Sequence, residues 1–304
     1  MSTSAARAVS VNKPLNPAKI LSTLQSEGKV IGRDYEAASL LACVQTGKHV
    51  LLEGPVGVGK TYLVTHVAEL LGREVVRVDG DSRYTEQKLT GWFDPPTVLK
   101  KGYGPDSYFD GPLATAMRKG AILFLNELNR MPEGVQNVLL PSLDEKRIEI
   151  PRIGTLEAKP GFTVIATQNP REFVATSHLS EALLDRFELI TLTYQSEEEE
   201  RAILKRATLF AQKGKANPEL LDWCVDLVRG TRGNAMFKRG ASIRAGVSLY
   251  DVAFSLGGTF EAFMRAAHLA LPTRVELSED GLDLGFAKVL ESLTEKTKKK
   301  SQSS

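Results

Sequence analysis

The chain has 304 residues, of which 42% are hydrophobic and 25% are charged. These fractions are those of ordinary globular proteins, and they exclude a chain that is disordered over most of its length. The 39 lysines and arginines nearly balance the 37 aspartates and glutamates, so no overall charge favours binding to nucleic acid or to an anionic membrane.

The predicted elements begin after a flexible N-terminus, residues 1–17, which is rich in serine and alanine. A strand at His49–Leu52 is followed by a glycine-rich turn and by the helical spacing of residues 61–71. Most of the later strands lack polar alternation, which is typical of a parallel sheet covered on both faces. We therefore expect an α/β fold over residues 18–194, with a parallel sheet between helices. The further predicted strands are residues 75–78, 121–125, 162–167 and 189–192.

The character of the chain changes after residue 192. Ser196 precedes four glutamates, a pattern that predicts a capping box in which Glu199 reaches back to the helix start. A metal or partner site at these glutamates is the alternative. Helical periodicity dominates the rest of the chain, so we expect a smaller all-α domain over residues 195–295 and a disordered basic tail at residues 296–304.

Residues 54–61 fit the pattern G-x-x-x-x-G-K-[ST] of a phosphate-binding loop, with a strand before it and a helix after it. Glycines let the backbone wrap phosphate groups, so that amide groups and the following helix N-terminus face negative charge. The lysine reaches the terminal phosphates and the threonine hydroxyl binds Mg²⁺. The predicted nucleotide-binding residues of this loop are Gly54, Pro55, Val56, Gly57, Val58, Gly59, Lys60 and Thr61.

A second apolar strand ends in Asn126 and Glu127, where such proteins place an acid for Mg²⁺ and then a base. Glu127 is predicted to polarise the attacking water. Asn126 offers only a neutral amide oxygen, which can still bind a water on the metal. We expect hydrolysis with a raised Mg²⁺ requirement, which Asn126→Asp lowers. A protein that binds nucleotide with little hydrolysis is the alternative.

In their order and spacing these motifs resemble those of the MoxR family of AAA+ ATPases. The match covers about residues 28–250, and it implies a P-loop core followed by a helical lid, with ATP and Mg²⁺ as cofactors. The matching segments are Gly32-Arg33, HVLLEGPVGVGKT, LFLNELNRMPEGVQNVLLPSLDE, VIATQNP and LSEALLDRF.

The resemblance implies catalytic roles for two residues outside the loop. Asn169 is similar to the sensor that positions the γ-phosphate and water; an Asn-Pro turn residue is the alternative. Arg186 resembles the arginine finger that acts on the ATP of a neighbouring subunit. An ion pair with Asp185 or Glu188 is the alternative for this arginine.

The resemblance also implies contacts to ATP from outside the core motifs. Arg244 resembles the lid arginine that contacts the phosphates, although the family usually has proline where this chain has Ile243. Val30 and Ile31 are expected to pack on the adenine ring, with ordinary core packing as the alternative.

Two segments stand where the MoxR-containing branch carries hairpin insertions. Residues 97–109 predict two short strands around a Gly-Tyr-Gly-Pro turn, and residues 147–158 predict a second hairpin. A plain surface loop is the alternative for the first. The residues expected to face a client there are Lys100, Lys101, Tyr103, Tyr108 and Phe109.

The expected function and location rest on the same resemblance. It implies a Mg²⁺-dependent ATPase that works as a homo-oligomer, a hexameric ring, and remodels or matures a client protein, such as one with a von Willebrand factor A domain. A nucleic-acid motor or loader and a small-molecule phosphotransferase are alternatives, the first disfavoured by the balanced charge. No purely apolar run is longer than residues 121–125, far short of the about 20 residues of a membrane span, so we expect a cytoplasmic protein without membrane insertion.

Overall fold

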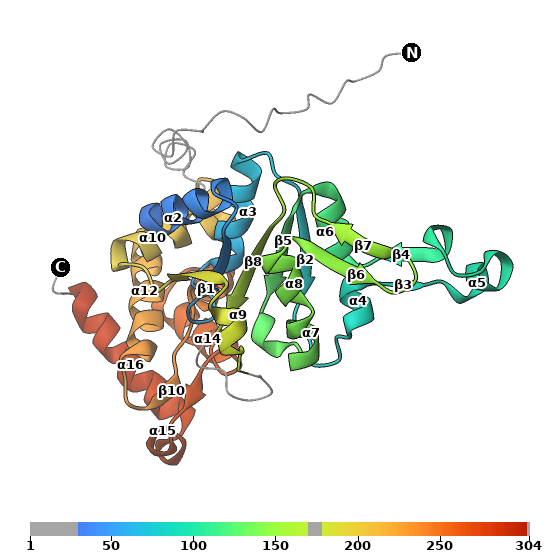
Figure 1. The fold of residues 1–304 in the computed structure, drawn as a ribbon. Helices are drawn as coiled ribbons and strands as arrows, with labels where there is room; N and C mark the ends of the chain where they lie inside the picture. Colours follow the sequence, from blue (N-terminus) through green and yellow to red (C-terminus); the bar gives the residue numbers. More distant parts are fainter. Residues whose placement is uncertain (1–29, 170–177, 303–304) are drawn as a thin grey trace. The chain divides into compact units, whose positions relative to one another are not determined.

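The computed structural model describes residues 30–169 and 178–302 (Figure 1). The predicted flexible N-terminus, residues 1–17, lies outside the described residues. The chain separates into two compact units. The first holds the described residues up to Pro55 together with Gly59–Thr193, and the second holds Val56–Val58 and the residues from Tyr194 onward.

The first unit is built on a five-stranded sheet in which every neighbouring pair of strands is parallel. The strand order is β2-β5-β8-β1-β9. The central strands β5, β8 and β1 are buried along almost their whole length, which is why they lack polar alternation in the sequence. The predicted parallel sheet is confirmed. The strand bounds are β1 His49–Glu53, β2 Val75–Asp79, β5 Ile122–Asn126, β8 Thr163–Gln168 and β9 Phe187–Thr191.

Helices cover both faces of this sheet (Figure 1). Leu123 and Leu125 of β5 share one hydrophobic core with the helices of the first face. Phe124 is equally buried but lies outside that core, because successive side chains of a strand point to opposite faces. The helices of the first face are α6 (Pro112–Lys119), α7 (Glu133–Asn137) and α8 (Leu139–Asp144), and those of the second are α2 (Asp34–Gln45) and α3 (Lys60–Leu70). The shorter elements are α4 (Glu86–Thr90), η2 (Leu128–Arg130) and α9 (Glu181–Leu184).

An arm of residues 91–110 projects from the sheet (Figure 1). Its strands are β3 (Gly91–Phe93) and β4 (Tyr108–Asp110), which pair antiparallel. The predicted strand at residue 97 is wrong, because α5 (Pro95–Lys101) and the 3₁₀ turn η1 (Pro105–Ser107) lie between them.

The start of α5 explains this error. The Asp94 side chain accepts a hydrogen bond from the Thr97 amide at 3.0 Å, as an N-cap does. Two prolines follow at the first helical positions, where a missing amide hydrogen costs nothing. Local capping therefore favours a helix over a strand at this point of the chain.

The second hairpin is present where the sequence places it. It pairs β6 (Arg147–Ile150) antiparallel with β7 (Gly154–Glu157). The backbone of Arg152 in the turn is left-handed, with a φ of 66°. The prediction for residues 147–158 is confirmed.

The second unit is helical. A single hydrophobic core, centred on side chains such as Tyr250 and Phe263, joins its main helices. The only sheet among its described residues is the antiparallel pair β10 (Phe237–Arg239) and β11 (Glu276–Leu277). The predicted helical C-terminal portion is confirmed. Its helices are α10 (Glu197–Ala207), α11 (Leu209–Gln212), α12 (Pro218–Arg232), α13 (Ile243–Ser255), α14 (Phe260–Ala270), α15 (Glu279–Leu284) and α16 (Phe286–Gln302).

Helix α16 corrects the prediction of a disordered tail, since it continues through residue 296 to Gln302. Lysine is a strong helix former, and positive charge near the C-terminal end of a helix is favourable. Among the described residues no helix combines the length and the apolar character needed to cross a membrane.

Candidate nucleotide-binding site

The phosphate loop follows β1 and leads directly into α3. Gly54, Gly57 and Gly59 have φ angles of 156°, 82° and 93°, a region that residues with a Cβ atom rarely adopt. A Cβ atom on Gly54 would also lie 2.3 Å from the carbonyl oxygen of Leu192. Backbone geometry and space therefore both require glycine at position 54.

Lys60 is folded back over this loop. Its Nζ donates hydrogen bonds to the carbonyl oxygens of Gly54 at 2.6 Å and Pro55 at 3.0 Å. Phosphate oxygens accept stronger hydrogen bonds from an ammonium group than neutral carbonyls do. The lysine therefore lies where an incoming phosphate group can take over its hydrogen bonds.

Four side chains and one backbone amide form what we call the strand-end network. Asn126 Oδ1 accepts hydrogen bonds from Thr61 Oγ1 at 3.3 Å and from Thr167 Oγ1 at 3.1 Å. Asn126 Nδ2 donates to Asp79 Oδ1 at 2.8 Å. The Glu127 amide donates to Thr167 Oγ1 at 2.8 Å. The network thus joins the start of α3 to the carboxyl ends of β2, β5 and β8, the edge of a parallel sheet at which ligands bind.

Asp79 and Thr167 are the two members of the network that sequence reasoning missed. Each lies at or near the carboxyl end of a strand, and a polar residue at that place was the available signal. Hydrogen bonds from Arg77 and, to a smaller extent, from Asn126 lower the pKa of Asp79. The carboxylate is therefore stabilised in its charged form.

Glu127 directly follows β5 with a left-handed backbone, φ 61° and ψ 53°. This conformation is costly for a residue with a side chain and is often found at functional sites. The Glu127 carboxylate, one third exposed, lies 2.9 Å from Nε of Arg130. The hydrogen bond of its amide to Thr167 holds the backbone in this conformation.

The other two predicted catalytic residues lie just beyond the ends of β8 and α9. Asn169 follows β8 directly and is buried. Arg186 pairs with Asp144 through Nε at 2.7 Å and Nη2 at 2.6 Å, and Nη1 donates to the Ala182 carbonyl. The alternative for Arg186 was an ion pair with Asp185 or Glu188. The arginine does form an ion pair, but with Asp144, because the fold brings the end of α8 beside it.

The residues expected around adenine and the phosphates belong to both units. Val30 is buried and Ile31 is partly buried. They precede Arg33, whose guanidinium group binds Glu36 at 2.8 Å and the Thr193 carbonyl. Arg244, in the second unit, is the second residue of α13, and it is exposed.

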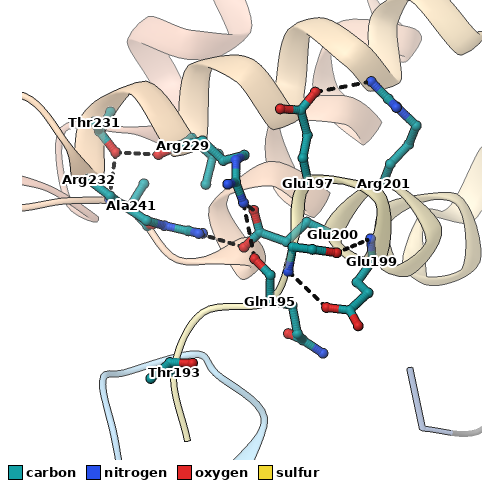
Figure 2. Close-up of polar contacts among 12 residues, drawn as sticks. Thr193, Gln195, Glu197, Glu199, Glu200, Arg201, Arg229, Thr231, Arg232 and Ala241 are labelled. Carbon is teal, nitrogen blue, oxygen red and sulfur yellow. Dashed lines mark hydrogen bonds and ion pairs between the residues drawn. The ribbon is translucent and has the colours of Figure 1, made fainter. Parts of the chain in front are cut away.

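The glutamate run at residues 197–200 has contacts within the second unit. The predicted capping box of Ser196 and Glu199 is confirmed. Figure 2 shows Glu200 between two arginines: Arg229 Nη1 lies 3.1 Å and Arg232 Nη1 2.5 Å from its carboxylate oxygens. Among the described residues no group of three or more His, Cys, Asp or Glu side chains could hold a metal ion. These glutamates therefore start and anchor a helix.

The same cluster holds the backbone before α13 (Figure 2). Arg232 Nε donates to the Ala241 carbonyl at 2.6 Å, and the Ala241 amide donates to Thr231 Oγ1 at 2.8 Å. Both polar groups of Ala241 are therefore bound to side chains of α12, three residues before Arg244.

Comparison with known proteins agrees with this architecture. A family model described as "AAA domain (dynein-related subfamily)" matches residues 49–187. The Gas vesicle ATPase GvpN of Ancylobacter aquaticus is 28% identical over 70% of this chain, which spans only 62% of that relative's length. An uncharacterized protein of Staphylococcus aureus (strain bovine RF122 / ET3-1) is 30% identical over 69% of this chain and 80% of its own.

Among solved structures, the RuvB Holliday junction branch migration motor of Thermotoga maritima matches with a TM-score of 0.52 and 18% identity. The match covers 79% of this chain and 70% of that one, and at this identity it shows the fold alone. Motifs, fold and relatives together show that the chain belongs to the AAA+ ATPase family, in its dynein-related branch and of MoxR type.

Proposed function

We propose that this protein hydrolyses ATP with Mg²⁺ as one subunit of a ring, and that it uses the hydrolysis to remodel a partner protein. The strand-end network carries the first part of this proposal. It brings the loop threonine, the strand-end amide and the backbone of the candidate base into one hydrogen-bonded group.

The oxygen atoms present fit a magnesium ion. Thr61 Oγ1 and Asn126 Oδ1 lie 3.3 Å apart, and hydroxyl and amide oxygens are ligands that hard cations accept. Thr61 would bind the ion directly and Asn126 through a water. When bound, the ion offsets the negative charge of the phosphates.

Residues of the first unit bind the phosphates, accept the proton of the attacking water and position that water. Lys60 leaves the carbonyl oxygens of the loop and binds the terminal phosphates. The Glu127 carboxylate accepts a hydrogen bond from the attacking water and then its proton. Asn169, at the end of the neighbouring strand, positions that water against the γ-phosphate.

The proposed ring gives Arg186 its role. In the isolated chain its guanidinium group is held by Asp144, and hydrogen bonding to Asp144 raises the pKa of Arg186. In the assembled ring it acts on the ATP of the neighbouring subunit, where a positive charge stabilises the transition state. Arg244 contacts the phosphates from the helical unit, and Val30 and Ile31 pack on adenine.

The arm formed by β3, α5 and β4 is the proposed contact for the client. Four of its large apolar side chains are about half exposed or more: Trp92 47%, Leu99 89%, Tyr103 55% and Phe109 50%. Lys100 and Lys101 are exposed beside them. Tyr108 does not belong to this surface, because it is partly buried and its hydroxyl donates to the Thr90 carbonyl at 3.0 Å. The client that the family resemblance suggests has a von Willebrand factor A domain.

The test uses Glu127→Gln, which keeps the shape of the side chain but removes the base. We expect turnover to fall by about 10²- to 10⁴-fold, while ATP affinity stays within about threefold, or ~0.7 kcal/mol. The ATP-bound variant should then retain a client in a pull-down, and Lys60→Ala should not. Turnover of Glu127→Gln equal to the wild type would refute the proposed base, and stimulation of turnover by DNA would favour a nucleic-acid motor instead.

A further inference from the structure

Asp79 has no assigned role in the nucleotide site, yet it makes a direct contact there. It is the last residue of the edge strand β2, and in the sheet register it lies opposite Asn126. Its Oδ1 accepts from Asn126 Nδ2 at 2.8 Å and from Arg77 Nη2 at 2.7 Å. The side chain is 61% exposed, so apolar burial does not explain its position.

The chemistry of this contact determines how the Asn126 amide is oriented. An ionised carboxylate can only accept hydrogen bonds, whereas a threonine hydroxyl can donate or accept. The amide nitrogen of Asn126 must therefore face Asp79, and its oxygen must face Thr61 and Thr167. Without Asp79 the two hydroxyl groups would accommodate either orientation, and the reversed one directs an N–H group at the magnesium site.

We propose that Asp79 is a positioning residue of the nucleotide site, which directs the Asn126 oxygen toward Thr61 and supplies from the neighbouring strand the negative charge that Asn126 lacks. This inference rests on the proposed function. One aspartate at the end of β5 would supply both the negative charge and the oxygen that faces the metal. Here Asp79 of β2 supplies the charge and Asn126 of β5 supplies the oxygen.

The inference changes what Asn126→Asp should do. The sequence alone predicts that this substitution lowers the Mg²⁺ requirement. In the structure it would place a second carboxylate against that of Asp79, in a contact that is now 2.8 Å long. Like charges at such a distance disfavour each other. The substitution should therefore be tolerated only in combination with Asp79→Asn, which restores one charge and one amide.

The test measures the dissociation constant of a fluorescent ATP analogue by titration, once with Mg²⁺ and once with EDTA. The dissociation constant in EDTA divided by the dissociation constant with Mg²⁺ reports how much the metal strengthens binding, without any turnover. For Asp79→Ala we expect this ratio to fall about tenfold, or ~1.4 kcal/mol, with little change in EDTA. Asn126→Asp should also have a low ratio, and Asp79→Asn with Asn126→Asp should recover most of it.

Asp81→Asn is the matched control. Asp81 also pairs with an arginine two residues away, Arg83 at 3.1 Å, and its carboxylate is an exposed acid of the same segment. Its ratio should equal that of the wild type. An Asp79→Ala ratio equal to that of the control, or an Asn126→Asp ratio above that of the double variant, overturns the inference.

Failure of the wild type to bind the nucleotide both with Mg²⁺ and in EDTA would instead contradict the proposed function. If Asp79→Ala lowers the melting temperature, the inference is tested by comparing the ratio of Asn126→Asp with that of the double variant. Both of these variants keep side chains of the wild-type size at positions 79 and 126.

Discussion

The buried histidine at the start of β1 leads to a quantitative prediction about stability. His49 is 5% exposed. Its Nδ1 accepts a hydrogen bond from the Val164 amide at 2.9 Å, and its Nε2 lies 3.3 Å from the Leu143 carbonyl and 2.6 Å from Lys146 Nζ. Burial and, secondly, the charge of Lys146 lower the pKa of His49 from 6.5 to about 4, against smaller opposite effects of the Leu143 carbonyl and of Asp144.

The direction of the effect follows from proton uptake. Between about pH 6.5 and pH 4 the unfolded chain binds a proton at His49 and the folded chain does not. The contribution of His49 to the free energy of unfolding is therefore complete above about pH 6.5 and is lost as the pH falls. With these two pKa values the loss between about pH 7.5 and pH 5 is ~2 kcal/mol, and the limit at lower pH is ~3.4 kcal/mol.

Urea unfolding followed by circular dichroism at the two pH values measures this loss. In His49→Asn the amide oxygen can still accept from Val164, but nothing titrates at position 49. The wild type should lose ~2 kcal/mol more than this variant on going to pH 5. His66→Asn, at a partly exposed histidine of α3, is the control and should behave as the wild type. Equal losses in the wild type and in His49→Asn would refute the reasoning.

Three further predictions concern single contacts. Lys60→Ala should weaken ATP binding by ~2 kcal/mol or more, because a charged hydrogen-bond donor to phosphate is lost; retained affinity in a nucleotide titration would contradict the site. Arg186→Ala should bind ATP but lose most turnover, and mixing it with inactive Lys60→Ala should restore part of the activity, whereas mixed rings without recovery would contradict action between subunits. Glu200→Gln should destabilise the helical unit by ~3 kcal/mol in urea unfolding, since it removes a buried charge between two arginines, while the exposed Glu197, changed to Gln, should cost less than ~0.5 kcal/mol.

Local rules account for the features that could be predicted from the sequence. The glycines and Lys60 of the phosphate loop, the capping box of Ser196 and the apolar run of β5 each depend on residues that are neighbours in the chain. The same kind of rule applies at α5, where Asp94 and the prolines after it indicate a helix start. The prediction of a strand at this place did not take that signal into account. The family resemblance then added roles for Asn169, Arg186 and Arg244, which remain predictions.

The contacts of Asp79, Arg186 and Glu200 were decided only by the tertiary structure. Asp79 meets Asn126 because β2 lies beside β5, although the two residues are 47 positions apart in the chain. Arg186 meets Asp144, and Glu200 meets Arg229 and Arg232, for the same reason. A charged residue can pair with any opposite charge that the fold brings near, so its sequence position does not name its partner. Only the order of strands and the packing of helices select one.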